Sequence, residues 1–167
     1  EMDYCDWSSD VCSSDLTERL FGIKIDKSAM QDVPKWHEDI EFFDINNETG
    51  QTIAHFYLDP YSRPAEKRGG AWMNECFGRR IISGKVRLPV IYLVCNGTPP
   101  IDGRPSLMSF GEVTTLFHEF GHALHGLLSN VSYKSLAGTN VYRDFVELPS
   151  QVMENWAADP AVLKMYA

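Results

Sequence analysis

The sequence predicts an α+β fold in which a small β-sheet precedes two packed helices. Two observations carry this prediction. Between residues 21 and 96, short apolar runs alternate with turn-forming residues, a pattern typical of strands. After Ser109, apolar residues recur at the three-to-four-residue spacing of a helix, and residues 146–159 continue as a second helical segment. The strands therefore precede the helices along the chain.

Residues 1–15 do not share the character of the rest of the chain. They are rich in Ser and Asp, show no sustained periodicity and resemble the translated adaptor strings found at the ends of assembled gene fragments. A flexible native arm is the alternative interpretation. We treat this segment as a non-native or disordered leader, which implies that the native protein is truncated upstream.

The apolar runs define the expected sheet. Residues 46–50 (NNETG) have the composition of a turn between two antiparallel strands, and Pro89 lies near the start of the most apolar run. Residues 21–25 are predicted as a short strand or an extended entry. Further strands are predicted over residues 40–45, 52–58 and 86–96.

Gly69, Gly70 and Ala71 form a stretch of very small side chains ahead of Trp72. Another backbone can approach such residues closely, as when a peptide adds a strand to a sheet edge. Gly70 and Ala71 are therefore candidate substrate-binding residues. The alternative, which composition favours, is a bulge or bend in a structural strand.

The first helix begins with a capping box, in which Ser109 is paired with Glu112. An apolar stripe along this helix is expected to face the core: Val113, Leu116, Phe117, Phe120, Leu124 and Leu127. In the second helix, Pro149 is expected in the first turn, where no backbone donor is needed.

The run HEFGH at residues 118–122 carries the chemistry. His118 and His122 are four residues apart, so both imidazoles project from one helix face and can reach the same metal ion. Glu119 lies beside that metal and can deprotonate a bound water. The pentapeptide also occurs by chance, and a helix with two core or surface histidines is then the alternative.

A catalytic zinc site needs a third protein ligand and one open position. Glu147, 25 residues after His122, follows a span long enough for a loop and the start of a second packed helix. His125 is the competing ligand, but seven residues separate its Cα from that of His118 by about 10.5 Å along the axis. His125 is more readily explained as an outer histidine or as a packed, hydrogen-bonded one.

Metal-binding histidines usually donate their second ring N–H to a carboxylate or a carbonyl. Glu154 lies seven residues beyond Glu147 on nearly the same helix face and is one candidate. Asp144 is the rival, although it is equally suited to capping the helix N-terminus.

Charge and cysteine content exclude several classes of function. The net charge of −8 argues against nucleic acid or an anionic membrane as partner, and no apolar run reaches the ~20 residues of a membrane span. The four cysteines fit neither a paired metal motif nor a disulfide framework. Cys76 and Cys95 read as reduced thiols, which favours a cytoplasmic location.

Several segments together resemble the thimet oligopeptidase family of zinc metallopeptidases, with the bacterial oligopeptidase A and peptidyl-dipeptidase branches the most similar. The resemblance extends from Leu16 to Ala167. The segments that carry it are residues 67–73, 88–96, 118–125, 135–140 and 143–156.

This resemblance implies one Zn²⁺ held by His118, His122 and Glu147, with Glu119 as general base. It further implies a mostly helical, zincin-like parent whose deep channel admits only short peptides. The family also uses a histidine and tyrosines from a later region to stabilise the oxyanion. We therefore expect residues 16–167 to be part of a catalytic domain truncated at both ends, without the oxyanion groups that the family uses.

The expected function is zinc-dependent hydrolysis of short oligopeptides, either internally or by removal of C-terminal dipeptides. One alternative is a non-catalytic zinc-stabilised or peptide-binding module. A structural zinc site would normally close with a fourth protein ligand, often Cys, and Cys76 and Cys95 occupy no such spacing. Another alternative is a zinc peptidase that shares only HExxH, against which the segment around Glu147 argues.

Overall fold

The computed structural model describes residues 5–6, 12–102, 104, 106–131 and 133–166. The strands are β1 (Cys5–Asp6), β2 (Lys24–Lys27), β3 (Glu41–Asn46), β4 (Thr52–Tyr61), β5 (Trp72–Phe77), β6 (Arg80–Ile82), β7 (Lys85–Arg87), β8 (Val90–Gly97) and β9 (Leu107–Met108). The helices are α1 (Cys12–Phe21), α2 (Phe110–Leu127), α3 (Arg143–Ala157) and α4 (Pro160–Tyr166), with a 3₁₀ turn, η1 (Lys134–Leu136). The predicted α+β class is confirmed.

Five of the described strands form one mixed sheet in the order β2-β3-β4-β8-β5. The β4–β8 pair is parallel and the other pairs are antiparallel. The predicted hairpin is confirmed, with Phe43 opposite Phe56 across β3 and β4. Its turn is closed by Asn47 Oδ1, which accepts from the amides of Thr49 and Gln51. Strand β5 is an edge of this sheet and follows Gly69–Ala71.

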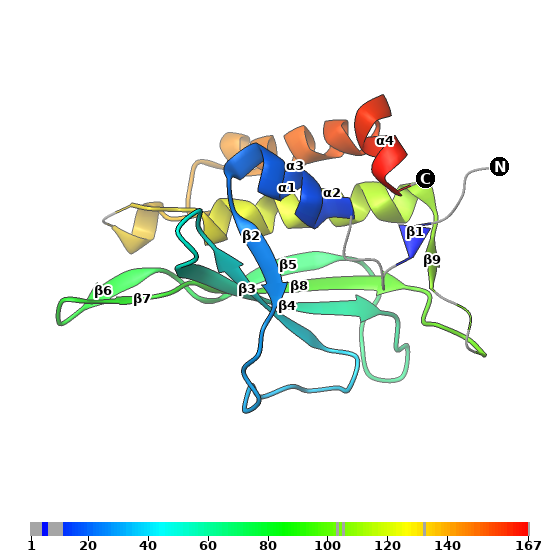
Figure 1. Ribbon diagram of the computed structural model, residues 1–167, viewed down its shortest axis with the longest axis horizontal. Helices are drawn as coiled ribbons and strands as arrows, with labels where there is room; N and C mark the ends of the chain where they lie inside the picture. The colour runs from blue at the N-terminus through cyan, green and yellow to red at the C-terminus, as the bar shows by residue number, and fades with distance from the viewer. Residues whose placement is uncertain (1–4, 7–11, 103, 105, 132, 167) are drawn as a thin grey trace.

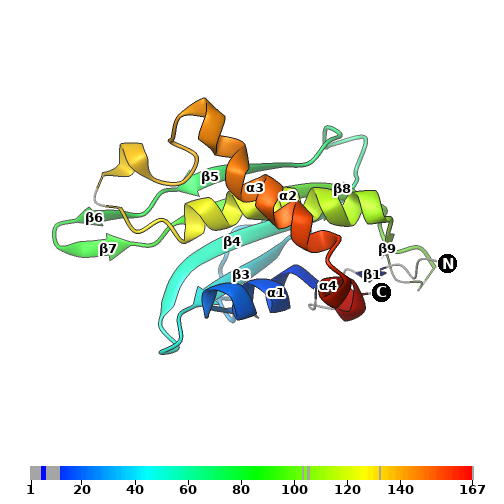
Figure 2. The same cartoon turned by 90° about the horizontal axis from the view of Figure 1, so that it is seen from above.

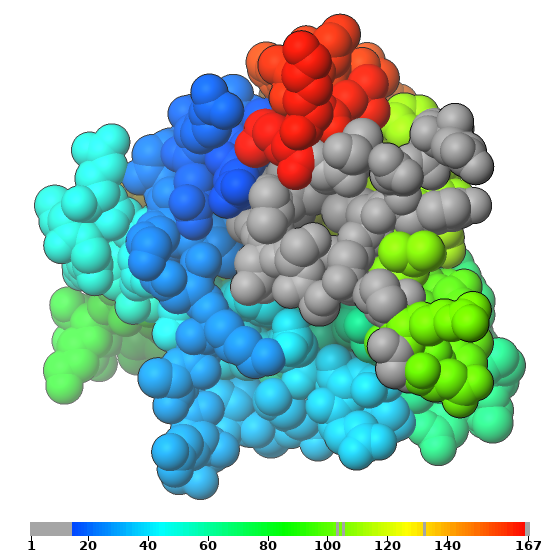
Figure 3. Space-filling model, turned by 45° about the vertical axis from the view of Figure 1, so that its right-hand side comes forward, coloured from blue at the N-terminus to red at the C-terminus, as the bar shows by residue number. Residues whose placement is uncertain are grey.

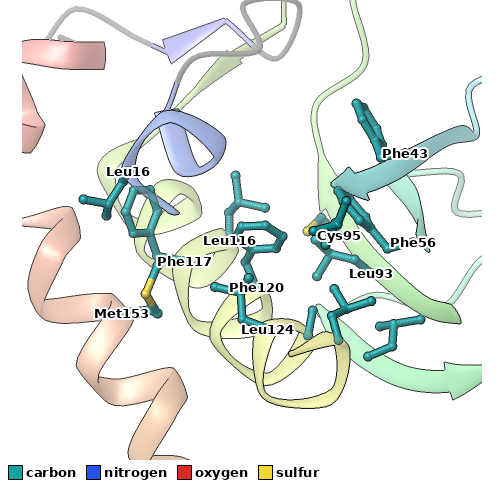
Figure 4. Packing of buried hydrophobic residues seen from close by; sticks show 14 of the residues in the cluster. Leu16, Phe43, Phe56, Leu93, Cys95, Leu116, Phe117, Phe120, Leu124 and Met153 are labelled. Atoms are coloured by element: carbon teal, nitrogen blue, oxygen red, sulfur yellow. The ribbon is translucent and has the colours of Figure 1, made fainter. Parts of the chain in front are cut away.

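The helices cover one face of the sheet, with α2 directly on the strands and α3 packed against α2 (Figure 1). On the sheet side, Phe120 and Leu116 lie toward Phe56 and Leu93 (Figure 4). On the other side, Phe117 lies between α1 and α3 with Met153 (Figure 4). Helix α2 is thus buried on two sides. Figure 3 shows α4 in red beside α1 in blue.

The local sequence explains why α2 forms. Ser109 Oγ accepts from the Glu112 amide, and Glu112 Oε2 accepts from the Ser109 amide at 2.7 Å, which confirms the capping box. The predicted apolar stripe is buried at every position: Val113, Leu116, Phe117, Phe120, Leu124 and Leu127. Among the described residues, no helix is both long and apolar enough to cross a bilayer.

Two strand predictions need correction. Of residues 21–25, only Lys24 and Ile25 belong to a strand, β2. Helix α1 ends at Phe21 and is followed by Gly22, whose φ of +64° suits glycine. Residues 86–96 are divided between β7 and β8. The break falls at Pro89, which cannot donate to a ladder.

The second helix begins earlier than predicted. Helix α3 begins at Arg143, which places Pro149 inside the helix instead of in its first turn. Pro149 cannot donate to the carbonyl of Phe145. Because Phe145 is exposed, solvent can replace that hydrogen bond. The buried face of the helix, which contains Ser150, Met153 and Ala157, compensates by packing.

The proposed leader, residues 1–15, is described only in part. Strand β1 pairs with β9 at Leu107 and Met108, and α1 begins at Cys12. Residues 1–4 and 7–11 lie outside the described residues. The interpretation as a non-native leader is tested by neither element and stays a prediction.

A buried ionic cluster holds the segment that leads into β5. Asp59, 2% exposed, accepts from Arg63 at 2.9 and 2.7 Å, from Lys67 at 2.9 Å and from Trp36 Nε1 at 3.0 Å. Lys67 also donates to three main-chain oxygens at the ends of β4 and β8. Burial raises the pKa of Asp59, but these donors together hold it below the ordinary value. Burial lowers the pKa of Lys67 despite its bonds to Asp59.

Replacement Asp59→Asn should destabilise the fold by about 3–5 kcal/mol, because two buried cations would lose their counter-charge. Urea unfolding at neutral pH measures the loss. Asp26→Asn is the control, since its ion pair with Lys24 is exposed to solvent and should contribute little to stability. In the wild type, the lowered pKa of Asp59 contributes stability above pH ~4 that is lost as pH falls further. Equal losses in both variants would contradict a structural role for this cluster.

Replacement Phe117→Ala should cost about 3–5 kcal/mol, because this ring is fully buried between α1, α2 and α3. Phe110→Ala, at an exposed position on the same helix, should cost less than ~1 kcal/mol. Thermal unfolding compares the two. A small effect at Phe117 would mean that the helices do not depend on this contact.

Candidate metal centre

Two histidines of α2 and one glutamate of α3 meet at the seam between these helices. Glu147 Oε2 lies 3.4 Å from His118 Nε2 and 3.1 Å from His122 Nε2. The two rings are 4.8 Å apart between centroids and nearly perpendicular. Among the described residues, these three side chains form a group that could hold a metal ion, with ligand atoms within 4.8 Å of one another. The structure thus brings together the three predicted ligands.

The arrangement arises because α3 crosses α2 obliquely (Figure 2). His118 and His122 are one turn apart, so their rings project together toward α3. Glu147 lies in the second turn of α3, where that helix passes the two rings. The side chain of His122 is 10% exposed whereas that of Glu147 is 51% exposed. The centre is therefore open to solvent on the Glu147 side.

Ser150 is a site residue that the sequence analysis missed. It is fully buried, and its Oγ lies 2.9 Å from both the main-chain oxygen and Oε2 of Glu147. The hydrogen bond from Ser150 is the largest influence on the pKa of Glu147 and lowers it. Burial is the second influence and raises the pKa, whereas the nearby His122 and His118 lower it, and the net pKa is lowered. Its position three residues after Glu147 on an expected helix was the available signal.

The rival carboxylates differ in position. His118 Nδ1 donates to Glu154 Oε1 at 2.5 Å. Because a carboxylate can only accept, this bond places the ring hydrogen on Nδ1 and leaves Nε2 free for a metal. Asp144 is exposed, and within the described part of the chain no hydrogen bond or ion pair connects it to a histidine. The geometry therefore favours Glu154 over Asp144.

His125 does not join the metal group formed by the described residues. Its ring lies edge-on to Phe145 at 6.2 Å, and its buried Nδ1 has no hydrogen-bond partner among the described residues. Burial, followed by the charge of His122, lowers the pKa of His125. His125 is therefore packed as expected, but its Nδ1 makes no hydrogen bond among the described residues. His122 Nδ1 likewise lacks a partner within the described ranges.

Glu119 lies next to the centre in a partly buried position. Burial is the largest influence on its pKa and raises it, and the charge of Glu147 adds to the increase. His118, His122 and the backbone amide of Met73 act in the opposite direction, and the net pKa is raised. The Met73 contact places edge strand β5 beside Glu119. Sequence patterns gave no sign of it, because 46 positions separate the two residues.

Gly70 and Ala71 lie immediately before β5. Gly70 has a φ of +89° in a bend, and its carbonyl oxygen accepts from the side-chain amide of Asn96. A bend is the alternative that the sequence favoured. Their role as substrate contacts stays a prediction, and the backbone amide of Met73, two residues after Ala71, bonds to Glu119.

Comparison with known proteins agrees with this geometry. Residues 7–167 match the model of peptidase family M3. The chain belongs to peptidase family M3. The resemblance to thimet oligopeptidases is therefore confirmed at the level of the family.

Curated relatives of this M3 chain are named as oligopeptidases and as a dipeptidyl carboxypeptidase. It is 52% identical over 146 residues to the organellar oligopeptidase A of Arabidopsis thaliana. The aligned region covers 84% of this chain and 18% of that protein. It is 44% identical over 151 residues to oligopeptidase A of Escherichia coli, covering 89% and 22%. It is 46% identical over 149 residues to the dipeptidyl carboxypeptidase of the same organism, covering 89% and 21%. The chain spans about a fifth of the length of these relatives.

Replacement Glu147→Ala should weaken Zn²⁺ binding by at least about 10-fold, because two imidazoles without the carboxylate form an incomplete ligand set. Competition with a colorimetric chelator measures the affinity. Asp144→Ala on the same helix is the comparison and should bind as the wild type does. Unchanged affinity in Glu147→Ala would indicate another third ligand.

Proposed function

We propose that this chain carries the zinc site of a metallopeptidase that hydrolyses peptide bonds in short oligopeptides. The observation that carries the proposal is the convergence of His118 Nε2 and His122 Nε2 on one oxygen of Glu147, with Glu119 beside them. Membership of peptidase family M3 supports it, as do relatives named as oligopeptidases.

The donor set fits zinc. Two neutral imidazole nitrogens and one carboxylate oxygen are the ligands of a common class of catalytic zinc site. The Glu154 bond to His118 Nδ1 supports this fit, because it presents Nε2 without a hydrogen. When bound, zinc would polarise a substrate carbonyl and lower the pKa of a water from ~16 to about 7.

Glu119 performs the proton transfers in the proposed reaction. Its carboxylate accepts a proton from the attacking water and delivers it to the leaving amine nitrogen. The Met73 amide holds this carboxylate on the β5 side. Glu154 orients His118, and Ser150 orients Glu147. These residues hold the reacting groups in a fixed relation before a substrate arrives.

Strand β5 is the proposed site of substrate docking. It is an edge strand that pairs only with β8 within the described sheet, and an extended peptide can add to such an edge through main-chain hydrogen bonds. Gly70 and Ala71 border the same edge and stay candidate substrate contacts. The bound backbone would then lie near Glu119, since Met73 belongs to this strand.

The alternative is a non-catalytic zinc-stabilised module. A structural zinc site is normally closed by four protein ligands. In the described part of the chain, the group has three such ligands, and the free cysteines Cys76 and Cys95 are not among them. The open position favours catalysis over a purely structural site.

Two further parts of the proposal concern the parent protein. We propose that residues 16–167 are part of a catalytic domain truncated at both ends. We further propose that side chains from a region C-terminal to this segment complete the oxyanion site. Relatives named as cytosolic and organellar oligopeptidases are equally similar, at 51% and 52% identity, so the cytoplasmic location stays a prediction.

Replacement Glu119→Gln in the complete protein should keep zinc but reduce turnover of a quenched fluorescent peptide by about 10²–10⁴-fold, because the amide cannot accept the proton. Chelator should abolish wild-type cleavage, and added zinc should restore it. Glu66→Gln, at an exposed loop position, is the control for the charge change. Retained turnover in Glu119→Gln would remove this residue from the role of base.

A further inference from the structure

Helices α2 and α3 approach closely at Gly121, one of the two positions that HExxH leaves unspecified between its histidines. A Cβ built on Gly121 would lie 2.7 Å from Ser150 Cα, 2.8 Å from the Pro149 carbonyl oxygen and 3.1 Å from Met153 Cγ. The two nearest atoms belong to the backbone of α3, so a rotamer change cannot relieve the contact. The helices can lie this close only because residue 121 has no side chain.

This contact lies between the two carboxylates that α3 brings to the centre. Ser150 is three residues after Glu147 and four before Glu154, so all three share one face of the helix. Glu147 reaches both Nε2 atoms from one side of the contact, and Glu154 reaches His118 Nδ1 from the other. The spacing at Gly121 therefore sets the reach of both carboxylates at once.

The tolerance of a metal site makes this spacing consequential. An added methyl group would need roughly 0.7 Å more room to reach ordinary contact distance. Metal–ligand distances are held to within about 0.2 Å. Side-chain torsions of Glu147 could absorb part of such a displacement, but Ser150 Oγ, which moves with the same helix, holds one of its oxygens.

We propose that Gly121 and Ser150 act together as a spacer that positions Glu147 for the metal, so that the residue inside the HExxH motif controls metal affinity. Gly121 sets the distance between the helices, and the Ser150 hydroxyl sets the direction of the carboxylate. Both are positioning residues. This inference rests on the proposed zinc site.

The test compares zinc affinity in the complete protein that contains this chain and in its variants, by chelator competition with Zn²⁺ alone. Gly121→Ala should raise the dissociation constant about 10–100-fold, the range found when partners outside the ligand shell are lost. Gly111→Ala is the matched control. It makes the same substitution in α2 where a Cβ meets only Ser109 Oγ at 4.0 Å, and it should leave affinity unchanged. Both variants replace glycine by alanine within α2, so a loss of zinc affinity in Gly121→Ala alone reports the contact with α3.

A spectroscopic measurement separates positioning from stability. The visible absorption of bound Co²⁺ reports the ligand geometry, and it should change in Gly121→Ala but not in Gly111→Ala. Thermal unfolding of the metal-free chains is recorded alongside. Equal zinc affinity and equal Co²⁺ spectra in Gly121→Ala and wild type would overturn the proposal. A wild type that binds no zinc would instead overturn the proposed function.

Ser150→Ala decides the case in which Gly121→Ala does not fold. This variant adds no bulk and keeps the helix spacing, but it removes the donor to Glu147. Its dissociation constant for Zn²⁺ should rise about 10-fold with thermal stability of the metal-free chain close to that of the wild type. Unchanged affinity in Ser150→Ala would overturn the spacer role.

Discussion

The backbone contact between α2 and α3 is the constraint on which the metal centre depends. Two imidazoles one turn apart are a property of a single helix, but the carboxylate opposite them belongs to another helix, 25 residues away. It reaches them because a glycine lies where the helices cross and because the facing residue is a small, fully buried serine. A larger residue on either side would separate the ligands before it affected either helix alone.

Helix α2 can support such a contact because it is held on two sides. Its apolar stripe packs on the sheet through Phe120 and Leu116, while Phe117 and Met153 fill the space toward α1 and α3 (Figure 4). The histidines lie along the seam, where His118 is partly exposed and His122 is buried. That position also explains why the pKa of Glu119 is raised: the side chain is partly buried, which suits the proton transfer proposed for it.

The sheet contributes more than a platform. The Asp59, Arg63 and Lys67 cluster joins the ends of β4 and β8 to the segment before β5, and β5 brings the Met73 amide to Glu119. The segment before β5 and the start of β5 therefore connect the ionic cluster to Glu119, which lies beside the metal centre. Among the described residues, the buried side-chain atoms without a hydrogen-bond partner include Nδ1 of His122 and of His125, and also Nε of Arg63 in the ionic cluster.

Local patterns were enough to identify much of this protein. Interactions between residues close together in the sequence determine three features that the structure shows as predicted. These are the capping box at Ser109, the apolar stripe of α2 and the hairpin around residues 46–50. The segment after Arg143 resembles a family strongly enough to indicate Glu147. Local patterns failed where packing overrode propensity: Pro149 lies inside α3 because the buried face of that helix outweighs one missing hydrogen bond. Only contacts between distant elements decide between Glu154 and Asp144 as the partner of His118. Such contacts also show that Ser150, Gly121 and Met73 lie near the centre. The amino-acid sequence determines which helix faces are apolar, but the distance between two helices depends on how the side chains of both fit together.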